Sequence, residues 1–259
     1  MKKRQSQRSE KKDGNMNYRF DIQYDGTRYG GWQRQKTTEN TIQGKIEEVL
    51  SRMTGNPVQI QGAGRTDAGV HALGQVANGH LDTPMSCEEI CEYMNHYLPE
   101  DIEILQVCQV SDRFHSRLNA KEKLYRYRIG TGSHKNVFER KYLCPLHETY
   151  NVKAMEQAAG YLTGTHDFKS FCSNKKLKKS TVRTLYEIRL TQLPNELQID
   201  YRGEGFLYNM VRILTGTLIE VGRGDRKPEE IPGILEGRDR GLAGFTAPAR
   251  GLTLVEVRY

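Results

Sequence analysis

Gly-Ala-Gly-Arg-Thr-Asp-Ala-Gly-Val-His-Ala, residues 62–72, follows the short β-prone stretch 58–61, so we predict a strand that runs into a glycine-rich loop. Glycine permits positive φ angles and lets a ligand approach the backbone closely. Asp67 lies in this loop two residues after Arg65, and both side chains can project from the same side of an extended turn. A neighbouring guanidinium favours the ionised carboxylate, the form that a nucleophile or a general base needs. Spacing alone favours a simpler interpretation, a β-turn with a surface Asp–Arg pair.

Hydrophobic periodicity predicts both strands and helices in the rest of the chain. Apolar residues that alternate with polar ones indicate strands, and apolar residues at helical spacing behind a capping residue indicate helices. We expect strands at 18–24, 58–61, 75–81, 102–110, 124–129, 182–190, 196–201 and 252–257. We expect helices at 42–53, 86–98, 152–162 and 208–221, and a short helix after Pro228.

The order of these elements predicts an α+β fold, because strands and helices mix without strict alternation. We expect a mixed, largely antiparallel sheet with helices on one side, and two pseudo-repeated halves around a central cleft. Residues 18–112 would form the N-terminal half with the glycine-rich loop, and residues 113–259 the C-terminal half that completes the cleft. Residues 1–17 form a predicted disordered basic tail, because they offer little apolar surface to bury.

Composition narrows the class of protein. The net charge is +7, but the tail holds six basic and two acidic residues, so the remaining 242 residues carry only +3. A polyanion-binding surface must therefore come from local clustering of charge. No apolar stretch approaches the roughly 18 residues of a membrane span, and no secretory signal is visible. The five cysteines are scattered without a Cys-x-x-Cys pair, which favours buried thiols in a reducing cytoplasm over zinc or disulfides.

Six blocks of sequence, in order, resemble the TruA family of tRNA pseudouridine synthases. Residues 62–72 resemble the catalytic motif of that family. The other blocks are residues 24–35, residues 114–117 with 123–127, residues 167–171, residues 206–212 and residues 246–252. The resemblance covers residues 18–259 and leaves out only the basic tail.

The resemblance implies an enzyme that isomerises uridine to pseudouridine in the anticodon stem-loop of tRNA, at positions about 38, 39 and 40. The N-glycosidic bond is cleaved, uracil turns in the pocket, and its C5 bonds to C1′ of the ribose. Nothing is added or lost, so we expect no cofactor and no metal. The resemblance further implies tRNA as the partner, rather than DNA or a membrane, a homodimer, and a cytoplasmic location.

The same resemblance implies roles for four residues. Asp67 matches the catalytic aspartate, which attacks the ribose, attacks C6 of uracil, or removes a ribose proton. Arg65 would help to extrude the target base, since a guanidinium can stack in the gap that the base leaves. Tyr125 would stack on the uracil, and its hydroxyl could accept or relay the C5 proton. Arg212 would pair with Asp67 from the second half of the chain.

Several of these residues also have a purely structural interpretation. Tyr125 and Tyr127 lie two residues apart on a predicted strand, and without the resemblance both would be interpreted as structural residues. A buried Arg212 needs a charged or polar partner whatever the function. Trp32 is either a core anchor or part of an RNA-facing loop. His71 is expected to stabilise the loop, without a catalytic role.

Basic residues cluster locally, as the charge count requires. The clusters are Arg113, His115 and Arg117; Lys121 and Lys123; Arg126 and Arg128, on the strand face opposite Tyr125; and Lys175, Lys176, Lys178, Lys179 and Arg183. Such runs are usually only solvated faces. Beside an RNA pocket, we expect at least some of them to contact phosphates.

Two other classes of protein compete with this interpretation. One is an RNA-binding module that has lost activity, although the complete set of Arg65, Asp67, Tyr125 and Arg212 argues against it. The other is a carboxylate-dependent hydrolase. A glycosidase needs a second carboxyl group about 5 to 9.5 Å from the first, and a phosphatase needs further acids with a metal. The acids nearest in sequence, Glu48 and Asp82, lie outside the loop.

Overall fold

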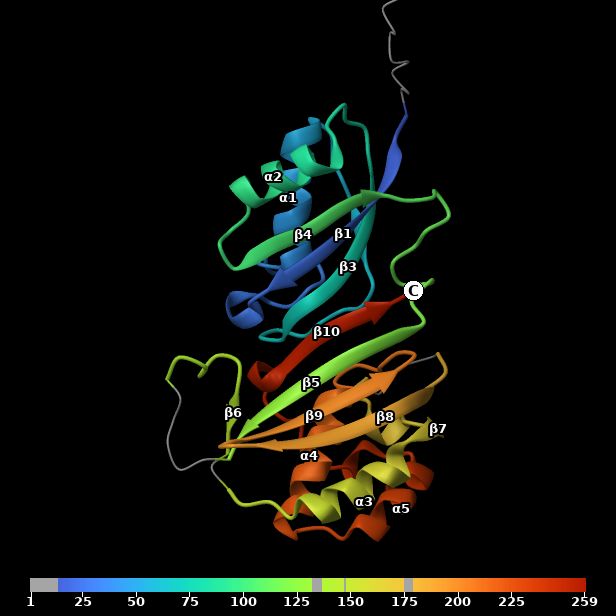
Figure 1. Ribbon diagram of the computed structural model, residues 1–259. Helices are drawn as coiled ribbons and strands as arrows, with labels where there is room; N and C mark the ends of the chain where they lie inside the picture. The colour runs from blue at the N-terminus through green and yellow to red at the C-terminus, as the bar shows by residue number, and fades with distance from the viewer. Residues whose placement is uncertain (1–13, 132–136, 147, 175–178) are drawn as a thin grey trace, which may run out of the picture.

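The computed structural model describes residues 14–131, 137–146, 148–174 and 179–259 as one sheet with helices on one of its faces (Figure 1). The strands are β1 (Met16–Tyr24), β2 (Ile60–Gly62), β3 (His71–Leu81), β4 (Ile102–Gln109), β5 (Glu122–Gly130), β6 (Cys144–Pro145), β7 (Gly164–Asp167), β8 (Val182–Leu193), β9 (Glu196–Gly203) and β10 (Leu252–Arg258). The α-helices are α1 (Ile42–Thr54), α2 (Cys87–Tyr97), α3 (Val152–Leu162), α4 (Met210–Arg223) and α5 (Ile231–Gly237). The predicted α+β class is confirmed.

The two halves repeat one topology. In the first, β1, α1, β2, β3, α2 and β4 follow one another along the chain, and the strands lie in the order β4-β1-β3-β2. In the second, β5, α3, β8, β9, α4 and β10 come in this order, with β6, β7 and α5 inserted between them, and the strands lie in the equivalent order β10-β5-β9-β8. Neighbouring strands in these two orders are antiparallel, whereas the two-residue β6 pairs with β5 in parallel. The predicted pseudo-repeat is therefore present in the topology, and it supports our proposal that the chain divides near residues 112 and 113.

One edge of β3 joins the halves. The end of β3 near Gly79 pairs with β2, whereas its start pairs in parallel with β10, through His71 with Thr253 and Ala72 with Leu254. The chain leaves β2 at Gly62 and re-enters the sheet at His71, so the intervening loop must lie where the two halves meet. The quoted segment is thus positioned by strands at both of its ends.

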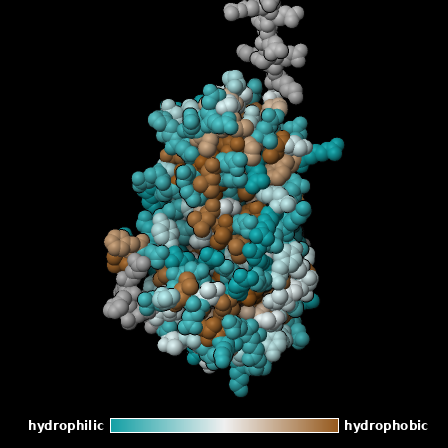
Figure 2. Space-filling model, viewed as in Figure 1, coloured by the Kyte–Doolittle hydropathy of each residue, from teal (hydrophilic) through white to brown (hydrophobic). Residues whose placement is uncertain are grey.

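Alternation along the strands separates a covered face from an open one. Phe20 and Ile22 of β1 are fully buried, while Arg19 and Asp21, which alternate with them, form an ion pair on the other face. Figure 2 looks onto the open face and shows apolar side chains gathered along its middle between hydrophilic ones. Leu73 of β3, which is 56% exposed, faces the shallow pocket on this side.

Element ends differ from the predictions by a few residues. β1 begins at Met16, so Met16 and Asn17 belong to the sheet rather than to the predicted tail, whose residues 1–13 lie outside the described part of the chain. β3 extends back to His71, and α4 begins at Met210 instead of Tyr208.

No helix in the described residues has the length and apolar character needed to cross a bilayer.

The segment 245–247, here called the closing segment, packs closely onto α4, and this packing depends on Gly216. A Cβ atom at this position would lie 1.9 Å from the carbonyl oxygen of Phe245, which is fixed backbone. Gly216→Ala should therefore lower the free energy of unfolding by about 1–3 kcal/mol, since the backbone must shift to relieve the overlap. Urea denaturation followed by circular dichroism measures this change.

Gly160→Ala is the matched control, because Gly160 is an exposed glycine of α3 with no atom within 4 Å of the added Cβ. It should raise stability by up to about 1 kcal/mol through helix propensity. Equal effects of the two substitutions would contradict the packing explanation.

Candidate active site in the cleft between the two halves

A cavity of about 670 Å³ lies between the two halves on the helix-covered face of the sheet. The first half contributes α1, the segment 32–34 and the loop that follows β2. The second half contributes Lys123 and Tyr125 of β5, the segment 206–212 that enters α4, and Lys179 with Arg183. The predicted central cleft is therefore present, and the glycine-rich loop lines it.

Backbone hydrogen bonds hold the middle of the loop. The Trp32 amide donates to the Thr66 carbonyl oxygen at 3.0 Å, and the hydroxyls of Tyr24 and Thr66 lie 2.8 Å apart. Gly31, with φ of 101°, lets the chain approach closely, because a Cβ there would lie 2.7 Å from the Thr66 oxygen. Thr66 is buried as a result, and Asp67 follows a fixed residue.

Two side chains hold the start of the loop by its carbonyl oxygens. The Gln75 amide of β3 donates to the Gly64 oxygen at 2.9 Å, and the Lys123 ammonium of β5 donates to the Ala63 oxygen at 2.7 Å. Strands of both halves therefore bind this loop. Its carbonyl groups are satisfied inside the protein, which favours a rigid platform for Asp67.

Asp67 pairs with Arg212 across the cleft. Nη1 of Arg212 lies 3.3 Å from Oδ2 of Asp67. The guanidinium is itself held, because Nε donates to the Ala247 oxygen at 2.7 Å and Nη1 donates to the Asn209 side chain at 3.0 Å. The Ala247 amide in turn donates to the Arg212 carbonyl oxygen at 3.0 Å. Arg212 is thus a fixed cation at the start of α4.

Burial sets the pKa of Asp67. The side chain is only 22% exposed, and this desolvation raises the pKa of its carboxyl group, while the charge and the hydrogen bond of Arg212 partly offset the rise. The sequence suggested that Arg65 would lower the pKa of Asp67, and that expectation is wrong. Arg65 is exposed and has no ion-pair or hydrogen-bond partner among the described residues. The charge that acts on Asp67 comes from the other half of the chain.

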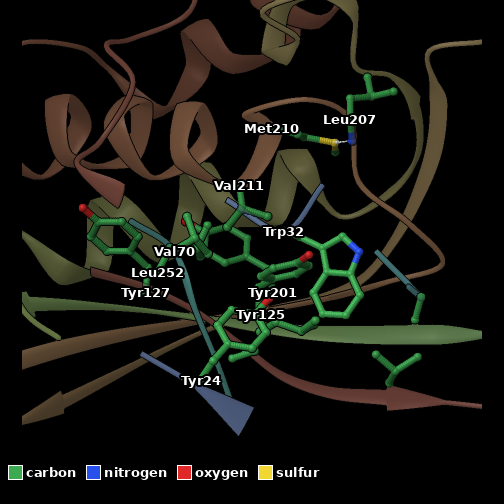
Figure 3. Packing of buried hydrophobic residues seen from close by; sticks show 14 of the residues in the cluster. Tyr24, Trp32, Val70, Tyr125, Tyr127, Tyr201, Leu207, Met210, Val211 and Leu252 are labelled. Carbon is green, nitrogen blue, oxygen red and sulfur yellow. Dashed lines mark hydrogen bonds between the residues drawn. The ribbon is translucent and has the colours of Figure 1, made fainter. Parts of the chain in front are cut away.

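Tyr125 lies on β5 with its ring in the aromatic wall of the cleft. Its ring and the Phe206 ring pack edge to face at a centroid distance of 5.1 Å, and Figure 3 shows Tyr125 with Tyr24 and Trp32. The side chain is 7% exposed, and burial raises the pKa of its hydroxyl. Within the described part of the chain this hydroxyl has no hydrogen-bond partner. A planar ring that entered the cavity would meet both an aromatic side chain and an available phenol.

Trp32 and His71 have structural roles. Trp32 is 1% exposed, and a Cβ at Gly62 would lie 2.6 Å from its indole ring, so the tryptophan is a core anchor. His71 is buried on the open-face side, where Nδ1 accepts from the Gly26 amide at 3.1 Å and Nε2 donates to the Lys141 oxygen at 3.0 Å. Burial lowers the pKa of His71 and favours the neutral imidazole, while the Asp25 carboxylate, 3.2 Å from Nδ1, partly offsets this effect.

The residues predicted to contact phosphates differ in where they lie and in whether an acid neutralises them. Arg126 pairs with Asp200 at 2.7 Å and Arg128 pairs with Glu196 at 2.7 Å, so these two arginines are neutralised on the open face of the sheet. Lys175, Lys176 and Lys178 lie outside the described residues. Arg117, Lys123, Lys179 and Arg183 line the cleft.

The sequence analysis missed a second carboxylate in the cleft, that of Glu47. This residue of α1 is only 4% exposed, and its Oε1 accepts from the Gln43 amide and from the Ile60 backbone amide. Its Oε2 lies 3.5 Å from Nη1 of Arg34. The available signal was a pair of polar residues, Gln43 and Glu47, one turn apart within the apolar face of a predicted helix. No cluster of three or more potential metal-ligating side chains occurs in the described ranges.

Comparisons with known proteins agree with one another. A family model described as tRNA pseudouridine synthase matches residues 22–119 and 158–259. A protein of Bacillus sp. (strain KSM-64) named tRNA pseudouridine synthase A is 49% identical over 94% of this chain and 99% of its own length. A protein of Clostridium tetani (strain Massachusetts / E88) named tRNA pseudouridine synthase A 1 is 45% identical over the same shares. A solved Cbf5-Nop10-Gar1 complex aligns with 92% of this chain and 49% of the matched chain, at 11% identity and a TM-score of 0.40.

The pairing of Asp67 with Arg212 can be tested by titration. The Asp67 carboxyl should titrate above its ordinary 3.8. Arg212→Gln should raise the pKa of Asp67 further, because it removes the only two effects that lower it. A carboxyl-detected NMR titration of labelled aspartate, with Asp67 assigned by its loss in Asp67→Asn, measures this value.

Arg65→Gln is the control, since it removes the same charge at a position that has no partner in the described part of the chain. It should leave the Asp67 titration where it is. A shift with Arg65→Gln and none with Arg212→Gln would restore the original sequence interpretation.

Proposed function

The chain belongs to the tRNA pseudouridine synthase family and is an isomerase that acts on uridine in tRNA, and from this premise we propose that Asp67 is its catalytic carboxylate. We further propose that the target uridines lie in the anticodon stem-loop, at positions about 38, 39 and 40. The observation that carries the proposal is the pair of Asp67 and Arg212 in the wall of the cleft, 3.3 Å apart and contributed by opposite halves. The pair keeps a reactive carboxylate oriented where little water surrounds it.

In the proposed reaction the bond between N1 of uracil and C1′ breaks, and a bond between C5 and C1′ forms. C5 loses a proton and N1 gains one, so atoms and electrons balance without a cofactor. Asp67 either attacks C1′ of the ribose, attacks C6 of uracil, or removes a ribose proton. All three routes need the ionised carboxylate, and Arg212 favours that form against the effect of burial.

Tyr125 is proposed to bind the uracil. Its ring can stack on the base, and its hydroxyl can accept or relay the proton that leaves C5; since burial keeps the phenol protonated, it would take up that proton as it passes on its own. The free hydroxyl supports this role, because the described protein groups leave it available to a substrate. The uracil must also rotate between its N1-bonded and its C5-bonded orientation. The face of an aromatic ring allows this rotation, because it forms no directional hydrogen bonds that would hold the base in one orientation.

Arg65 is proposed to assist extrusion of the target base. Its side chain is exposed in the loop that carries Asp67, and it is not held by any described residue. A free guanidinium can stack where the base has left the helix or contact a phosphate beside it. This role differs from the first interpretation of Arg65 as a partner of Asp67.

Glu47 bears on the competing hydrolase. It is the second carboxylate that lines the described cleft, and a glycosidase would need such a group as an acid or base. Both of its oxygens, however, are engaged by Gln43, the Ile60 amide and Arg34. These contacts favour a structural role for Glu47 and leave Asp67 as the reactive acid.

Unmodified tRNA incubated with the protein should acquire pseudouridine at positions 38 to 40, as mapped by carbodiimide-dependent reverse-transcription stops. Asp67→Asn should reduce the rate by roughly a thousandfold or more, because an amide can act neither as nucleophile nor as base. The affinity of this variant for tRNA should stay nearly unchanged, which a filter-binding assay measures.

Glu47→Gln is the matched control, the same change of carboxylate to amide at the other acid of the cleft. It should keep most of the activity. Full activity of Asp67→Asn would refute the catalytic assignment, and release of free uracil would indicate the hydrolase. Pseudouridine only outside positions 38 to 40 would refute the proposed target.

We also propose that the protein is a cytoplasmic homodimer. The five described cysteines are free thiols, which suits a reducing compartment. A second copy would lengthen the basic surface available to a tRNA arm, and the apolar band on the open sheet face offers a surface for it (Figure 2). Sedimentation equilibrium should give twice the monomer mass of 29.7 kDa. A species of monomer mass alone at working concentration would rule out the dimer.

A further inference from the structure

The charges that line the cleft do not balance. Among the described residues, seven cationic side chains line it, but only two carboxylates do. Asp67 pairs with Arg212 and Glu47 pairs with Arg34, so each carboxylate is already matched by one arginine. The other five cations have no acidic partner among the described residues, and they are Arg65, Arg117, Lys123, Lys179 and Arg183 together. An excess of this kind inside a cavity calls for an anion from outside the protein.

Lys123 is the most deeply placed of these cations. It lies on β5 two residues before Tyr125, so both side chains project from the same face of the strand. One N–H of its ammonium group is used by the Ala63 carbonyl oxygen. An ammonium group carries three donors, so two remain for a ligand in the cavity.

Arg117 and Arg183 are near enough to act on Lys123. Burial lowers the pKa of Lys123 to about 8, and the charges of Arg117 and Arg183 add to this effect. Arg117 follows Ser116, which is fully buried and fixed by hydrogen bonds to Gln61 and Asn78. The protein therefore holds three mutually repelling cations at one wall of the cleft.

The position of Lys123 identifies which anion would fit. A Cβ atom at Gly64 would lie 3.6 Å from the Lys123 ammonium and 3.6 Å from the Tyr125 hydroxyl, so these two groups flank the same point of the loop. A phosphate bound by Lys123 would lie beside a ring bound at Tyr125. The base of a nucleotide and the phosphates next to its own ribose lie about as far apart as the Tyr125 hydroxyl and the Lys123 ammonium. A more distant phosphate of the same strand lies too far from the base to reach Lys123.

We propose that Lys123, together with Arg117 and Arg183, binds a phosphodiester group next to the target uridine. The inference rests on the proposed function, since it takes the base at Tyr125 as given. Such a site distinguishes a uridine within an RNA strand from a free nucleoside. It also connects substrate binding to the reactive loop, because the same ammonium group holds the Ala63 carbonyl oxygen.

The test is a double-mutant cycle that removes the negative charge of one RNA linkage and the positive charge of Lys123, separately and together. The probe is a synthetic anticodon stem-loop RNA in which the linkage on either side of the target uridine is, in turn, a methylphosphonate. At one of these linkages the wild-type protein should bind the neutral RNA roughly tenfold or more weakly than the natural RNA, which is the size expected for charge-assisted hydrogen bonds. Lys123→Met should bind the natural RNA about equally weakly, and the neutral linkage should cost it nothing further.

Two variants serve as controls, with affinities measured by fluorescence anisotropy at one fixed salt concentration. Lys121→Met removes an exposed lysine two residues away that does not line the cleft, and it should keep the full sensitivity to the neutral linkage. Lys123→Arg keeps the charge and should also keep that sensitivity. Circular dichroism checks that each variant is folded.

The inference would be overturned if the losses of RNA affinity from the neutral linkage and from Lys123→Met were strictly additive in free energy. If Lys123→Met weakened binding of natural and neutral RNA by the same factor, the lysine would only support the loop through Ala63. Pseudouridine formation by the wild-type protein on the natural stem-loop is measured in parallel. Its presence without coupling at Lys123 would refute this inference alone, whereas its absence would refute the proposed function.

Discussion

The shared edge of β3 is the constraint on which the site depends. Two strands pair with the same edge of β3. β2 pairs with the part near Gly79, and β10 pairs with the part near His71. The loop that leaves β2 must therefore pass the place where β10 begins to pair with β3. This places Asp67 at the junction of the halves, where α4 can supply Arg212. The site follows from how two copies of one topology are joined, and neither copy could form it alone.

Glycines at this junction allow backbone segments from different parts of the chain to approach. Gly31 lies against the Thr66 carbonyl oxygen, and Gly216 lies against the Phe245 carbonyl oxygen. The first contact fixes the residue before Asp67. The second brings the closing segment onto α4, where Ala247 holds Arg212 by a reciprocal pair of hydrogen bonds. Both partners of the ion pair are thus positioned by close packing of the backbone, which favours preorganisation.

Local pattern predicted the elements of this fold well, and the reason is physical. The alternation of Phe20 and Ile22 with Arg19 and Asp21 reflects one covered and one open face of the sheet, and that pattern is visible in any window of β1. Candidate residues such as Asp67 and Tyr125 stood out only because ordered blocks resembled a known family. The spacing of Arg65 and Asp67 alone suggested an ion pair that the structure does not contain.

What the sequence could not supply are partners distant along the chain. Asp67 and Arg212 are 145 positions apart, and Lys123 holds Ala63 from 60 positions away. Glu47 escaped notice for the same reason, because its contact with Ile60 depends on how α1 packs on β2. The acids that neutralise Arg126 and Arg128 come from β9, a strand that pairs with β5 only in the folded sheet. Pairings of this kind depend on topology, which a single sequence does not encode locally.

The raised pKa of Asp67 and its proposed use as an ionised carboxylate are compatible through Arg212. Burial alone would favour the protonated acid, and a base stacked on Tyr125 would exclude still more water from the cleft. A mobile cation could move away from Asp67 as the substrate entered, but Arg212 is fixed by the Ala247 oxygen at Nε and by the Asn209 side chain at Nη1, the nitrogen that also contacts Asp67. The attraction between opposite charges grows as water leaves, because the local dielectric constant falls. Substrate entry therefore strengthens the interaction that keeps Asp67 ionised at the same time as it increases the cost of that charge.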